Sequence, residues 1–585
     1  MKPSKYQQAV LDAVLNDTCN LMIGAVAGSG KTATLKMICE QMAVAFPRLS
    51  ILALAFNKEI ALALGAKLPA SVVSKTMHSL GSGILRDNLP AFTVDAHGKK
   101  QAKALVKMFG ETRKLEPKMK KYTDILLKLV SKVRNTCTST NNWSDIEAMA
   151  VEYDVELDVL FEAKLPTAIA ADVEALCKAL RAERTTIDFD DMLDFPVHYQ
   201  LKSRQSYDLV LVDESQDLNR LQAEFLSLLL GSKPAISSFS ALDDLLGDVG
   251  ITAAKPKDAP SRPTMNRVVL VGDVRQAIYK FRGADSKSMA NLATTFGARQ
   301  LPLSICYRCP LSVVRKARTV IGPIIEPSLT AEEGEVVYNE SGQLDQLIAT
   351  LKSGDMVMSR TNAPLLGLAL CCVRAGKKVV IRGNLDVGLG LIKLIQDICK
   401  RYDASSMLEF TKALEEHTNE QIEKAIDDDK ANIATRWGEK YECLIGLAEQ
   451  MKSVDELTGF LSRIFNDKSD VGIIFSSIHR AKGLEADHAV ILQPEKLPHP
   501  MSYRSNNVEA ALEQERNLAY VAVTRAMKKL TLQPLPDDRK TPFPRLQLVL
   551  DQAANRRAML GVEGGIYGDF LSVDENDELP NPLDL

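Results

Sequence analysis

The sequence predicts an α/β protein built from two parallel-sheet domains in tandem, each interrupted by a mainly helical insertion. At 585 residues the chain exceeds what one hydrophobic core can organise, so several domains are expected. Short apolar runs that end at Gly, Ser or Asp alternate with helical patterns, which is typical of parallel α/β architecture. This alternation occurs in two separate series, and a long helical stretch breaks each series once.

The two series of apolar runs give the expected strands. The first series comprises Leu21–Ile23, Ile51–Ala55, Leu209–Val212 and Val268–Val271. The second comprises Met356–Met358, Val379–Ile381, Ile473–Phe475, Ala489–Leu492 and Leu530–Leu532. We therefore expect a first domain over 1–85 and 187–295, and a second over 296–385 and 469–560. The helical insertions cover 86–186, which is rich in Lys, and 386–468.

Two further stretches have the composition of loosely structured chain. Residues 233–266 hold several Pro, Ser and Asp residues and are expected to form a long surface loop. The segment 561–585 is acidic and contains Pro and Gly, which is typical of a flexible tail. A solubilising role for this tail is the simpler interpretation, and binding of a protein partner is the alternative.

Composition limits the class of protein. The net charge is −3, so whole-chain charge gives no support to a nucleic-acid partner. Cys306 and Cys309 have CxxC spacing, but no second pair completes a zinc or iron–sulfur site, and free thiols are the better interpretation. The N-terminus lacks the apolar run of a signal peptide, and no stretch reaches membrane-spanning length. We expect an intracellular protein, cytoplasmic or nucleoid-associated, or nuclear in a eukaryote.

A glycine-containing loop follows the first expected strand, and a helical pattern opens directly after it. Two glycines let backbone N–H groups close around phosphate oxygens, and the helix N-terminus adds the positive end of its dipole. Lys31 would reach the β- and γ-phosphates, and Thr32 would hold Mg²⁺. Position 25 carries Ala where the strict template has Gly. The nucleotide-binding residues expected here are Ala25, Val26, Ala27, Gly28, Ser29, Gly30, Lys31 and Thr32.

A second piece of a nucleotide site follows the strand at Leu209–Val212. This apolar run delivers Asp213 and Glu214 to its carboxyl end, where α/β folds place their ligands. Asp213 would hold Mg²⁺, directly or through water, and Glu214 could take a proton from the attacking water. Two solvated acids in a turn are the structural alternative. The glycine loop disfavours it, because phosphate chemistry of this kind needs such acidic partners.

Further motifs follow in a fixed order along the chain. They are Leu54–Lys58, Thr76–Ser79, Asp213–Asp217, Val271–Ala284, Tyr307-Arg308, His479–Glu485 and Glu515–Ala526. Together with Gln7 and the loop at 25–32, these segments resemble the UvrD/Rep/PcrA-like helicases of superfamily 1A, in which Ala at the first loop position is tolerated. The resemblance covers most of the chain and implies two RecA-like domains. It also implies ATP and Mg²⁺ as cofactors.

The resemblance implies roles for individual residues. Gln7 and Tyr307 would face adenine, Glu485 the ribose, and Gln216 and Gln276 would report occupancy by the γ-phosphate. The implied contacts to single-stranded DNA are Phe56, Asn57, Lys58, Thr76, His78, Tyr279, Phe281, Arg282, His479 and Lys482. Aromatic residues two apart ordinarily pack in a core, but in the family those of the 271–284 segment stack on bases. Phe281 stands where a Trp is common.

Two arginines of the second domain bear on hydrolysis. Charge spreading over the γ-phosphoryl oxygens needs cations, and arginine fingers contribute about 10³–10⁵ in rate. Arg308 and Arg525 belong to the second α/β domain, so they could reach this charge only when the two domains close. Closure and opening around ATP would then become stepping along a strand.

Two charged stretches admit more than one interpretation. The carboxylates at 188–191 could indicate a nuclease, but a full two-metal ligand set is not visible, and the family carries a similar acidic stretch without nuclease chemistry. The basic residues of the first insertion either form a solvated helical face or contact duplex phosphates. They are Lys99, Lys100, Lys103, Lys107, Arg113, Lys114, Lys118, Lys120, Lys121, Lys128, Lys132 and Arg134.

Three departures from the family bear on function. The segment 54–58 is one residue shorter than in the best-known bacterial enzymes and is closer to the F-box DNA helicase branch. The second insertion is small, and only Pro534–Pro542 stands where related enzymes carry a strand-splitting hairpin. We expect a 3′-to-5′ DNA helicase, acting on single strands and strand junctions as a monomer or weak dimer. The alternatives are a single-strand translocase that removes bound proteins and unwinds poorly, and a nucleotide-binding switch without movement on DNA.

Overall fold

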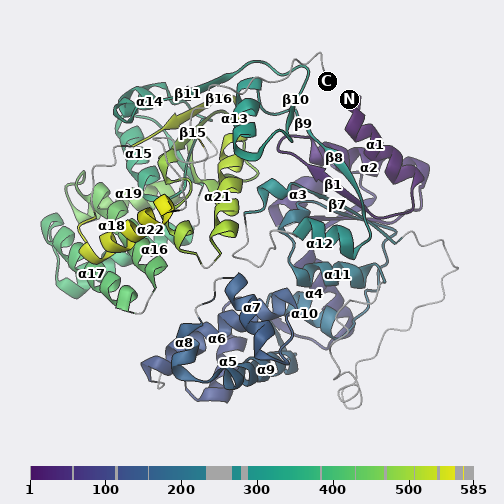
Figure 1. Cartoon of the computed structure of the whole chain (residues 1–585), viewed down its shortest axis with the longest axis horizontal. Coiled ribbons are helices and arrows are strands. Elements are labelled where there is room, and N and C mark those ends of the chain that lie inside the picture. The colour runs from purple at the N-terminus through teal and green to yellow at the C-terminus, as the bar shows by residue number, and fades with distance from the viewer. Residues whose placement is uncertain are drawn as a thin grey trace. The chain divides into compact units, whose positions relative to one another are not determined.

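A computed structural model gives the fold of the chain (Figure 1). It describes residues 2–55, 58–111, 116–153, 155, 157–231, 266–278, 288–382, 385–427, 430–466, 471–505, 507–535, 541–559 and 571. The chain divides into two compact units, the first formed by 1–26 and 30–304 and the second by 27–29 and 305–585. Each unit carries its own sheet, as the two series of apolar runs predict, and each sheet has six strands where the runs number four and five.

The first unit is built on a parallel sheet with the strand order β3-β2-β6-β7-β1-β8. The strands are β1 (Leu21–Ala25), β2 (Ile51–Ala55), β3 (Val72–Thr76), β6 (Leu209–Val212), β7 (Arg267–Gly272) and β8 (Arg299–Leu303). The central strands β2, β6 and β7 are buried at every residue, which is why they appear in the sequence as unbroken apolar runs.

Helices cover both faces of this sheet. The core on one face joins the strands to α1 (Lys5–Asn16), α2 (Lys31–Ala45) and α3 (Lys58–Gly65). The core on the other face joins them to α4 (Met77–Asn88), α10 (Asp191–His198), α11 (Arg220–Leu229) and α12 (Ser288–Thr295). Alternate residues of each strand contribute to the two cores, because successive side chains of a strand point to opposite faces.

The strands that the sequence did not predict lie at the edges of this sheet. β3 and β8 pair on one side only and expose or half-expose most of their residues. Such edge strands need no continuous apolar run, so the pattern used for prediction is missing. β8 also carries the first unit to Ser304, beyond the boundary at 295 expected from the sequence.

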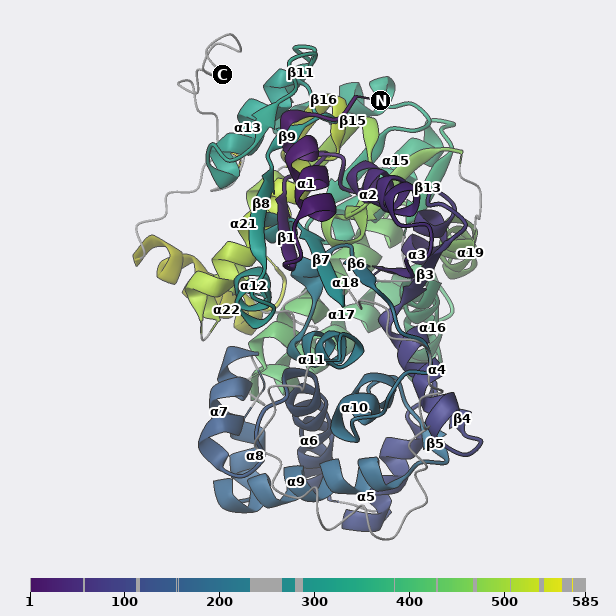
Figure 2. The same cartoon turned by 90° about the vertical axis from the view of Figure 1, so that its right-hand side faces the viewer.

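The Lys-rich insertion of the first unit forms a helical cluster of its own (Figure 2). Its helices are α5 (Lys99–Phe109), α6 (Pro117–Thr136), α7 (Trp143–Glu152), α8 (Asp158–Ala163) and α9 (Pro166–Ala182). They enclose a separate apolar core. A two-stranded sheet, β4 (Thr93–Val94) with β5 (Thr186–Ile187), brings the two ends of the insertion together.

The second unit repeats the plan with the strand order β11-β16-β15-β12-β14-β13, again parallel. Its strands are β11 (Glu335–Tyr338), β12 (Met356–Ser359), β13 (Val379–Arg382), β14 (Ile473–Ser477), β15 (Ala486–Leu492) and β16 (Ala526–Gln533). Helices α14 (Leu344–Thr350) and α15 (Ala363–Arg374) pack on one face. Helices α13 (Leu311–Ile321) and α21 (Val508–Val523) belong to the same unit. The sequence did not predict the edge strand β11, nor the short paired strands β9 (Ile305–Cys306) and β10 (Glu326–Pro327) of this unit.

The second helical insertion lies between β13 and β14 in the chain, and Figure 1 shows its helices grouped together. It consists of α16 (Leu385–Tyr402), α17 (Met407–Asp427), α18 (Ala431–Ala448) and α19 (Val454–Asn466), and α22 (Pro544–Met559) joins their core from the far end of the chain. Leu366 and Leu370 of α15 belong to the same core, so the insertion packs directly on the sheet domain.

Several sequence expectations fall wholly or mainly outside the described residues. These are the surface loop at 233–266, the acidic tail at 561–585 and the middle of the segment Pro534–Pro542. All ten cysteines carry free thiols. Every described helix is too short or too polar to span a lipid bilayer.

Candidate nucleotide and DNA sites

The glycine loop connects the carboxyl end of β1 to the first turn of α2. Gly28 and Gly30 have φ of 67° and 79°, a left-handed conformation that glycine adopts without strain. Gly30 is the N-cap of α2, so the free N–H groups of the first helical turn, including that of Thr32, belong to this loop. The hydroxyl of Ser29 is buried and has no hydrogen-bond partner among the described residues. A buried loop with unused polar groups fits the binding of phosphate oxygens.

The acidic pair lies at the end of β6, two strands away from β1 in the sheet. Asp213 is 7% exposed, and its Oδ1 accepts the N–H of Glu214 at 2.9 Å. Glu214 has φ of 53°, an uncommon conformation for a residue with a side chain and one that functional sites often contain. Its carboxylate lies 3.0 Å from the Nζ of Lys31. The structure thus joins the two sequence motifs in one ion pair.

The ionisation of Lys31 depends on three carboxylates. Burial lowers its pKa, but Glu214, Asp213 and Asp273 together outweigh burial and raise the pKa above its ordinary value. The ammonium group is therefore charged at neutral pH, as a phosphate ligand must be. Burial raises the pKa of Asp273, and Lys31 opposes that shift.

Hydrogen bonds connect the two predicted glutamine sensors to this charged cluster. The Nε2 of Gln216 donates to Glu214 at 2.5 Å, and its Oε1 accepts the backbone N–H of Asp273 at 2.9 Å. The Nε2 of Gln276 donates to the carboxylate of Asp273 at 2.5 Å. A change at Glu214 would therefore be transmitted to the segment after β7 through direct contacts. No role was predicted for Asp273, although an acid two residues after the apolar run Val268–Val271 was a usable signal.

The residues expected to hold Mg²⁺ suit a weakly protein-bound ion. Thr32 and Asp213 offer a hydroxyl and a carboxylate, the hard oxygen ligands that Mg²⁺ prefers. Among the described residues, no group of three or more His, Cys, Asp or Glu side chains could hold a metal on its own. Mg²⁺ at phosphate sites commonly takes one or two protein oxygens and completes its shell with water and phosphates. The oxygens of Thr32 and Asp213 therefore fit an Mg²⁺ ion that is also bound by water and phosphate.

Gln7 lies beside the helical end of the glycine loop. It is 5% exposed, and its Nε2 donates to the hydroxyl of Thr34 at 3.1 Å. Its Oε1 accepts the N–H of Ser4 at 3.0 Å and closes a capping box at the start of α1. Both ends of the side-chain amide are thus engaged, and reading an adenine would require exchanging at least one of these bonds.

The predicted nucleotide residues of the second unit have the following surroundings. Tyr307 is 48% exposed. The Nε of Arg308 lies 2.7 Å from a carboxylate oxygen of Glu485. Arg525 is 1% exposed and donates to the carbonyls of Val521 and Leu484 at 2.8 and 2.9 Å. The roles of these residues toward ATP stay predictions.

The predicted DNA residues that the structure describes lie at or just after the carboxyl ends of strands in both sheets. Thr76 ends β3 and caps α4 through a 3.2 Å bond from the N–H of Ser79, and His78 is in the first turn of that helix. His479 belongs to the short helix α20 (Ile478–Ala481) after β14, and Lys482 follows it. Burial, together with the nearby charge of Arg360, lowers the pKa of His479 to about 4. The imidazole is therefore neutral at pH 7.

Family models match both parts of the chain. The UvrD/REP helicase N-terminal domain matches residues 6–297, and the UvrD-like helicase C-terminal domain matches residues 405–534. The chain belongs to the UvrD-like helicase family. The matched regions contain the glycine loop, the acidic pair and the segments at 479–485 and 515–526.

Individual UvrD-like relatives share modest identity with the chain. "ATP-dependent DNA helicase UvrD2" of Mycobacterium tuberculosis is 26% identical over 420 residues, covering 62% of this chain and 53% of the relative. "F-box DNA helicase 1" of Gallus gallus is 25% identical over 580 residues, covering 91% of this chain and 49% of the relative. "ATP-dependent DNA helicase UvrD1" of Mycobacterium leprae is 23% identical, covering 89% and 81%. The chain thus spans about half the length of the first two relatives.

Half of the UvrD-like DNA contacts predicted from the sequence lie outside the described residues. Those are Phe56, Asn57, Tyr279, Phe281 and Arg282. Lys58, at the start of α3, is exposed.

Phe189 is a further candidate for DNA contact that sequence reasoning missed. Its side chain is 56% exposed, although large apolar residues are usually buried. Its ring meets that of His78 edge-on, with centroids 6.4 Å apart. An exposed aromatic ring beside a predicted DNA residue offers a stacking surface for a base. The sequence signal was an apolar residue within an acidic stretch, which was interpreted only through its carboxylates.

The acidic stretch itself ties the UvrD-like core to its first insertion. Asp191 lies 2.5 Å from the Nζ of Lys100 and 2.6 Å from a guanidinium nitrogen of Arg134. Asp194 accepts two 2.8 Å bonds from Arg181. Lys100 and Arg134 are 3% and 2% exposed, so for these two members of the basic run neither a solvated face nor a phosphate contact holds. The described members Lys99, Lys103, Lys107, Lys118, Lys120 and Lys128 are exposed.

Proposed function

We propose that this protein is an ATP-dependent DNA helicase that translocates 3′ to 5′ on single-stranded DNA and unwinds duplex at strand junctions. The observation that carries the proposal is a cluster of charged side chains at the ends of three adjacent strands. Lys31 pairs with Glu214. Gln216 bonds to both Glu214 and Asp273, and Gln276 bonds to Asp273. The family and the relatives named as ATP-dependent DNA helicases support it.

The chemistry of the first unit follows from its side chains. Lys31 would exchange its bond to Glu214 for a phosphate oxygen, which frees the carboxylate to orient and deprotonate an attacking water. Thr32 and Asp213 would hold Mg²⁺, which neutralises charge on the phosphates. Because Gln216 bonds to both Glu214 and Asp273, the loss of the Lys31–Glu214 pair would alter the segment after β7. That segment leads into the predicted base-stacking residues.

The second unit would supply cations during hydrolysis. We carry over from the family resemblance that Arg308 and Arg525 stabilise charge on the γ-phosphoryl group. Arg525 is fixed by carbonyl acceptors of its own unit, which hold its guanidinium in a defined direction. Arg308 is held by Glu485, so the residue predicted to face the ribose would also position a cation.

Stimulation of ATP hydrolysis by single-stranded DNA is the first test of this proposal. The helicase proposal and the translocase alternative both require it, whereas a nucleotide-binding switch that does not move on DNA does not. We expect a stimulated rate that Lys31→Ala abolishes while the circular dichroism spectrum stays unchanged. Absence of stimulation in the unmodified protein would remove both motor functions, and retained hydrolysis in Lys31→Ala would refute the assigned site.

A single-strand translocase that removes bound proteins is the second candidate. The short segment Pro534–Pro542, in the place of a strand-splitting hairpin, favours it. Displacement of streptavidin from a biotinylated single strand, compared with unwinding of a tailed duplex, separates the two candidates. We propose an intracellular protein that acts as a monomer or weak dimer and whose acidic tail contacts a protein partner.

A further inference from the structure

A pocket in the second unit lies between the edge of the sheet and the second helical insertion. Its volume is about 640 Å³, within the range of roughly 300–1,000 Å³ that small-ligand pockets occupy. The sheet contributes residues at the carboxyl ends of β13 and β14, and the insertion contributes α16, α18 and α19. Carboxyl ends of parallel strands are the edge where α/β folds bind ligands.

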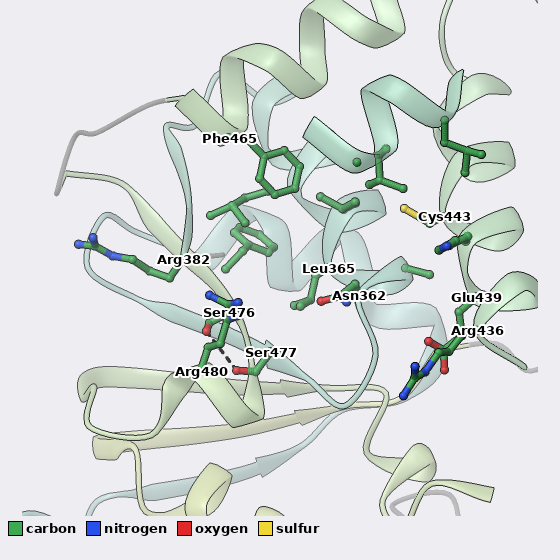
Figure 3. A pocket seen from close by; sticks show the side chains of 18 of the residues that line it. Asn362, Leu365, Arg382, Arg436, Glu439, Cys443, Phe465, Ser476, Ser477 and Arg480 are labelled. Carbon is green, nitrogen blue, oxygen red and sulfur yellow. Dashed lines mark hydrogen bonds between the residues drawn. The ribbon is translucent and has the colours of Figure 1, made fainter. Parts of the chain in front are cut away.

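The pocket combines an apolar interior with a basic rim. Leu365, Leu394 and Phe465 are among the apolar side chains that line it, and Figure 3 shows Phe465 on its wall with Arg382 and Arg436 on opposite sides. Five basic side chains line the pocket against two acidic ones, Asp397 and Glu439. The five are Arg382, Lys393, Arg436, Lys440 and Arg480, and all are exposed. One of the two acids, Glu439, is engaged by the Nε2 of His499 at 3.2 Å.

This distribution of charge selects an anionic ligand with an apolar or aromatic part. A nucleotide of a DNA strand has that chemistry, since its phosphates carry the charge and its base presents an aromatic face. A small apolar ligand would leave the rim cations unused, and a bare phosphate would leave the apolar interior unused. The ring of Phe465 is half-buried, so part of it faces the pocket.

The pocket also adjoins residues already proposed to contact DNA. Arg480 lines it and stands between His479 and Lys482. A strand that contacts His479 and Lys482 would therefore pass the rim of the pocket.

We propose that this pocket receives one unstacked nucleotide of the bound single strand, with its base in the apolar interior and the flanking phosphates on the insertion lysines. The inference rests on the proposed function, because it needs a DNA strand on the second unit. It adds DNA contacts from the second helical insertion, namely Lys393, Lys440 and Phe465, to those at 479–482. The small insertion would thus grip the strand.

The phosphate part is tested by fluorescence anisotropy of a labelled oligo(dT) with the full chain at several salt concentrations. The variant Lys393→Ala/Lys440→Ala removes two rim cations, and Lys412→Ala/Lys424→Ala removes two exposed lysines of α17 outside the pocket. Each phosphate contact on a single strand contributes about 0.7 to the slope of log K against log salt. We expect the rim variant to lower the slope by about 1.4 and the control variant to leave it unchanged. Equal slopes in the two variants would overturn the proposal.

The base part is tested with an abasic site moved along the oligonucleotide. In the parent protein, one position should weaken binding by about fivefold to 150-fold, the range of a lost base–aromatic stack. In Phe465→Leu, which keeps an apolar side chain but removes the ring, that position should lose most of its effect. An abasic profile identical in Phe465→Leu and parent would overturn base insertion.

Two further measurements distinguish this proposal from binding of a free nucleotide and from failure of the proposed function itself. Competition by free thymidine monophosphate as effective as that by the oligonucleotide would assign the pocket to a free nucleotide and overturn the strand assignment. Failure of the parent protein to bind the oligonucleotide would remove the proposed function itself, whereas parent binding with unaffected pocket variants would remove only this inference. The rate of ATP hydrolysis without DNA should be the same in all these variants as in the parent. An unchanged rate would show that the first unit is intact in each variant.

Discussion

Replacing Glu214 by Gln tests the assignment of the general base. The carboxylate of Glu214 lies 3.0 Å from the ammonium of Lys31 and accepts a 2.5 Å bond from Gln216. Gln has nearly the same shape, and its amide oxygen can still accept the bond from Gln216. What disappears is the negative charge and the ability to take a proton.

The expected loss of activity is large and the expected loss of stability is small. A positioned general base contributes about 10²–10⁴ in rate, which corresponds to roughly 3–5 kcal/mol of barrier. The Lys31 and Glu214 side chains are only 13% and 20% exposed, so their ion pair is largely desolvated. Breaking a buried pair costs about 3–5 kcal/mol when one charge is left alone. In Glu214→Gln, Asp213 and Asp273 still offset the charge of Lys31. We therefore expect the free energy of unfolding to fall by only about 1–2 kcal/mol.

Single-turnover hydrolysis with saturating single-stranded DNA measures the chemical step directly. A fluorescent ATP analogue measures binding, and we expect its affinity in Glu214→Gln to stay within about threefold of the parent because Lys31 is retained. Glu40→Gln, on the exposed side of α2, is the matched control and should hydrolyse ATP normally. Hydrolysis in Glu214→Gln within tenfold of the parent would refute the role of Glu214 as base.

Three further predictions follow from the site geometry. Lys482→Ala should reduce the slope of log K against log salt for single-strand binding by about 0.7. His479→Ala should weaken binding without changing this slope, because the pKa of His479 is lowered to about 4 and its ring is neutral. Equal slope changes in the two variants would contradict this. Phe189→Ala should weaken oligo(dT) binding by about 1–3 kcal/mol in anisotropy titrations, with an unchanged unfolding midpoint, and unchanged affinity would exclude stacking. Asp194→Asn should destabilise the first unit by about 3 kcal/mol in urea unfolding at pH 7, because Arg181 loses its charged partner. Although burial opposes ionisation, Arg181 and Arg134 hold the pKa of Asp194 below its usual range. The stability contributed by the ionised carboxylate is therefore present above about pH 4. The difference in unfolding free energy between Asp194→Asn and the parent should shrink only as pH falls below that value.

Buried elements of the fold could be predicted from the sequence, and edge elements could not. β2 and β6 occupy the residues predicted for them, because a strand covered on both faces is apolar throughout. β3 and β8 were not predicted, because one side of each has no neighbouring strand and their residues are mostly exposed or half-exposed. The boundary between the units was misplaced for the same reason, since β8 belongs to the first sheet.

The candidate site was predictable where motifs are continuous and not where side chains meet through space. The glycine loop and the acidic pair each occupy one short segment, so spacing alone indicates their chemistry. The contact of Lys31 with Glu214 joins residues 183 positions apart, and Asp273 enters only because β7 lies between β1 and β6. The pairing of Asp191 with Lys100 also depends on the fold, which is why charge runs alone left the role of that lysine open.

Strand displacement on duplexes with a 3′ or a 5′ single-stranded tail tests the central claim most directly. The parent protein with ATP and Mg²⁺ should release the labelled strand from the 3′-tailed substrate and not from the 5′-tailed one, and Lys31→Ala should release neither. Release only from the 5′-tailed duplex would contradict the proposed polarity. Release of either strand by Lys31→Ala would contradict an ATP-driven motor built on the site that Lys31 and Glu214 form.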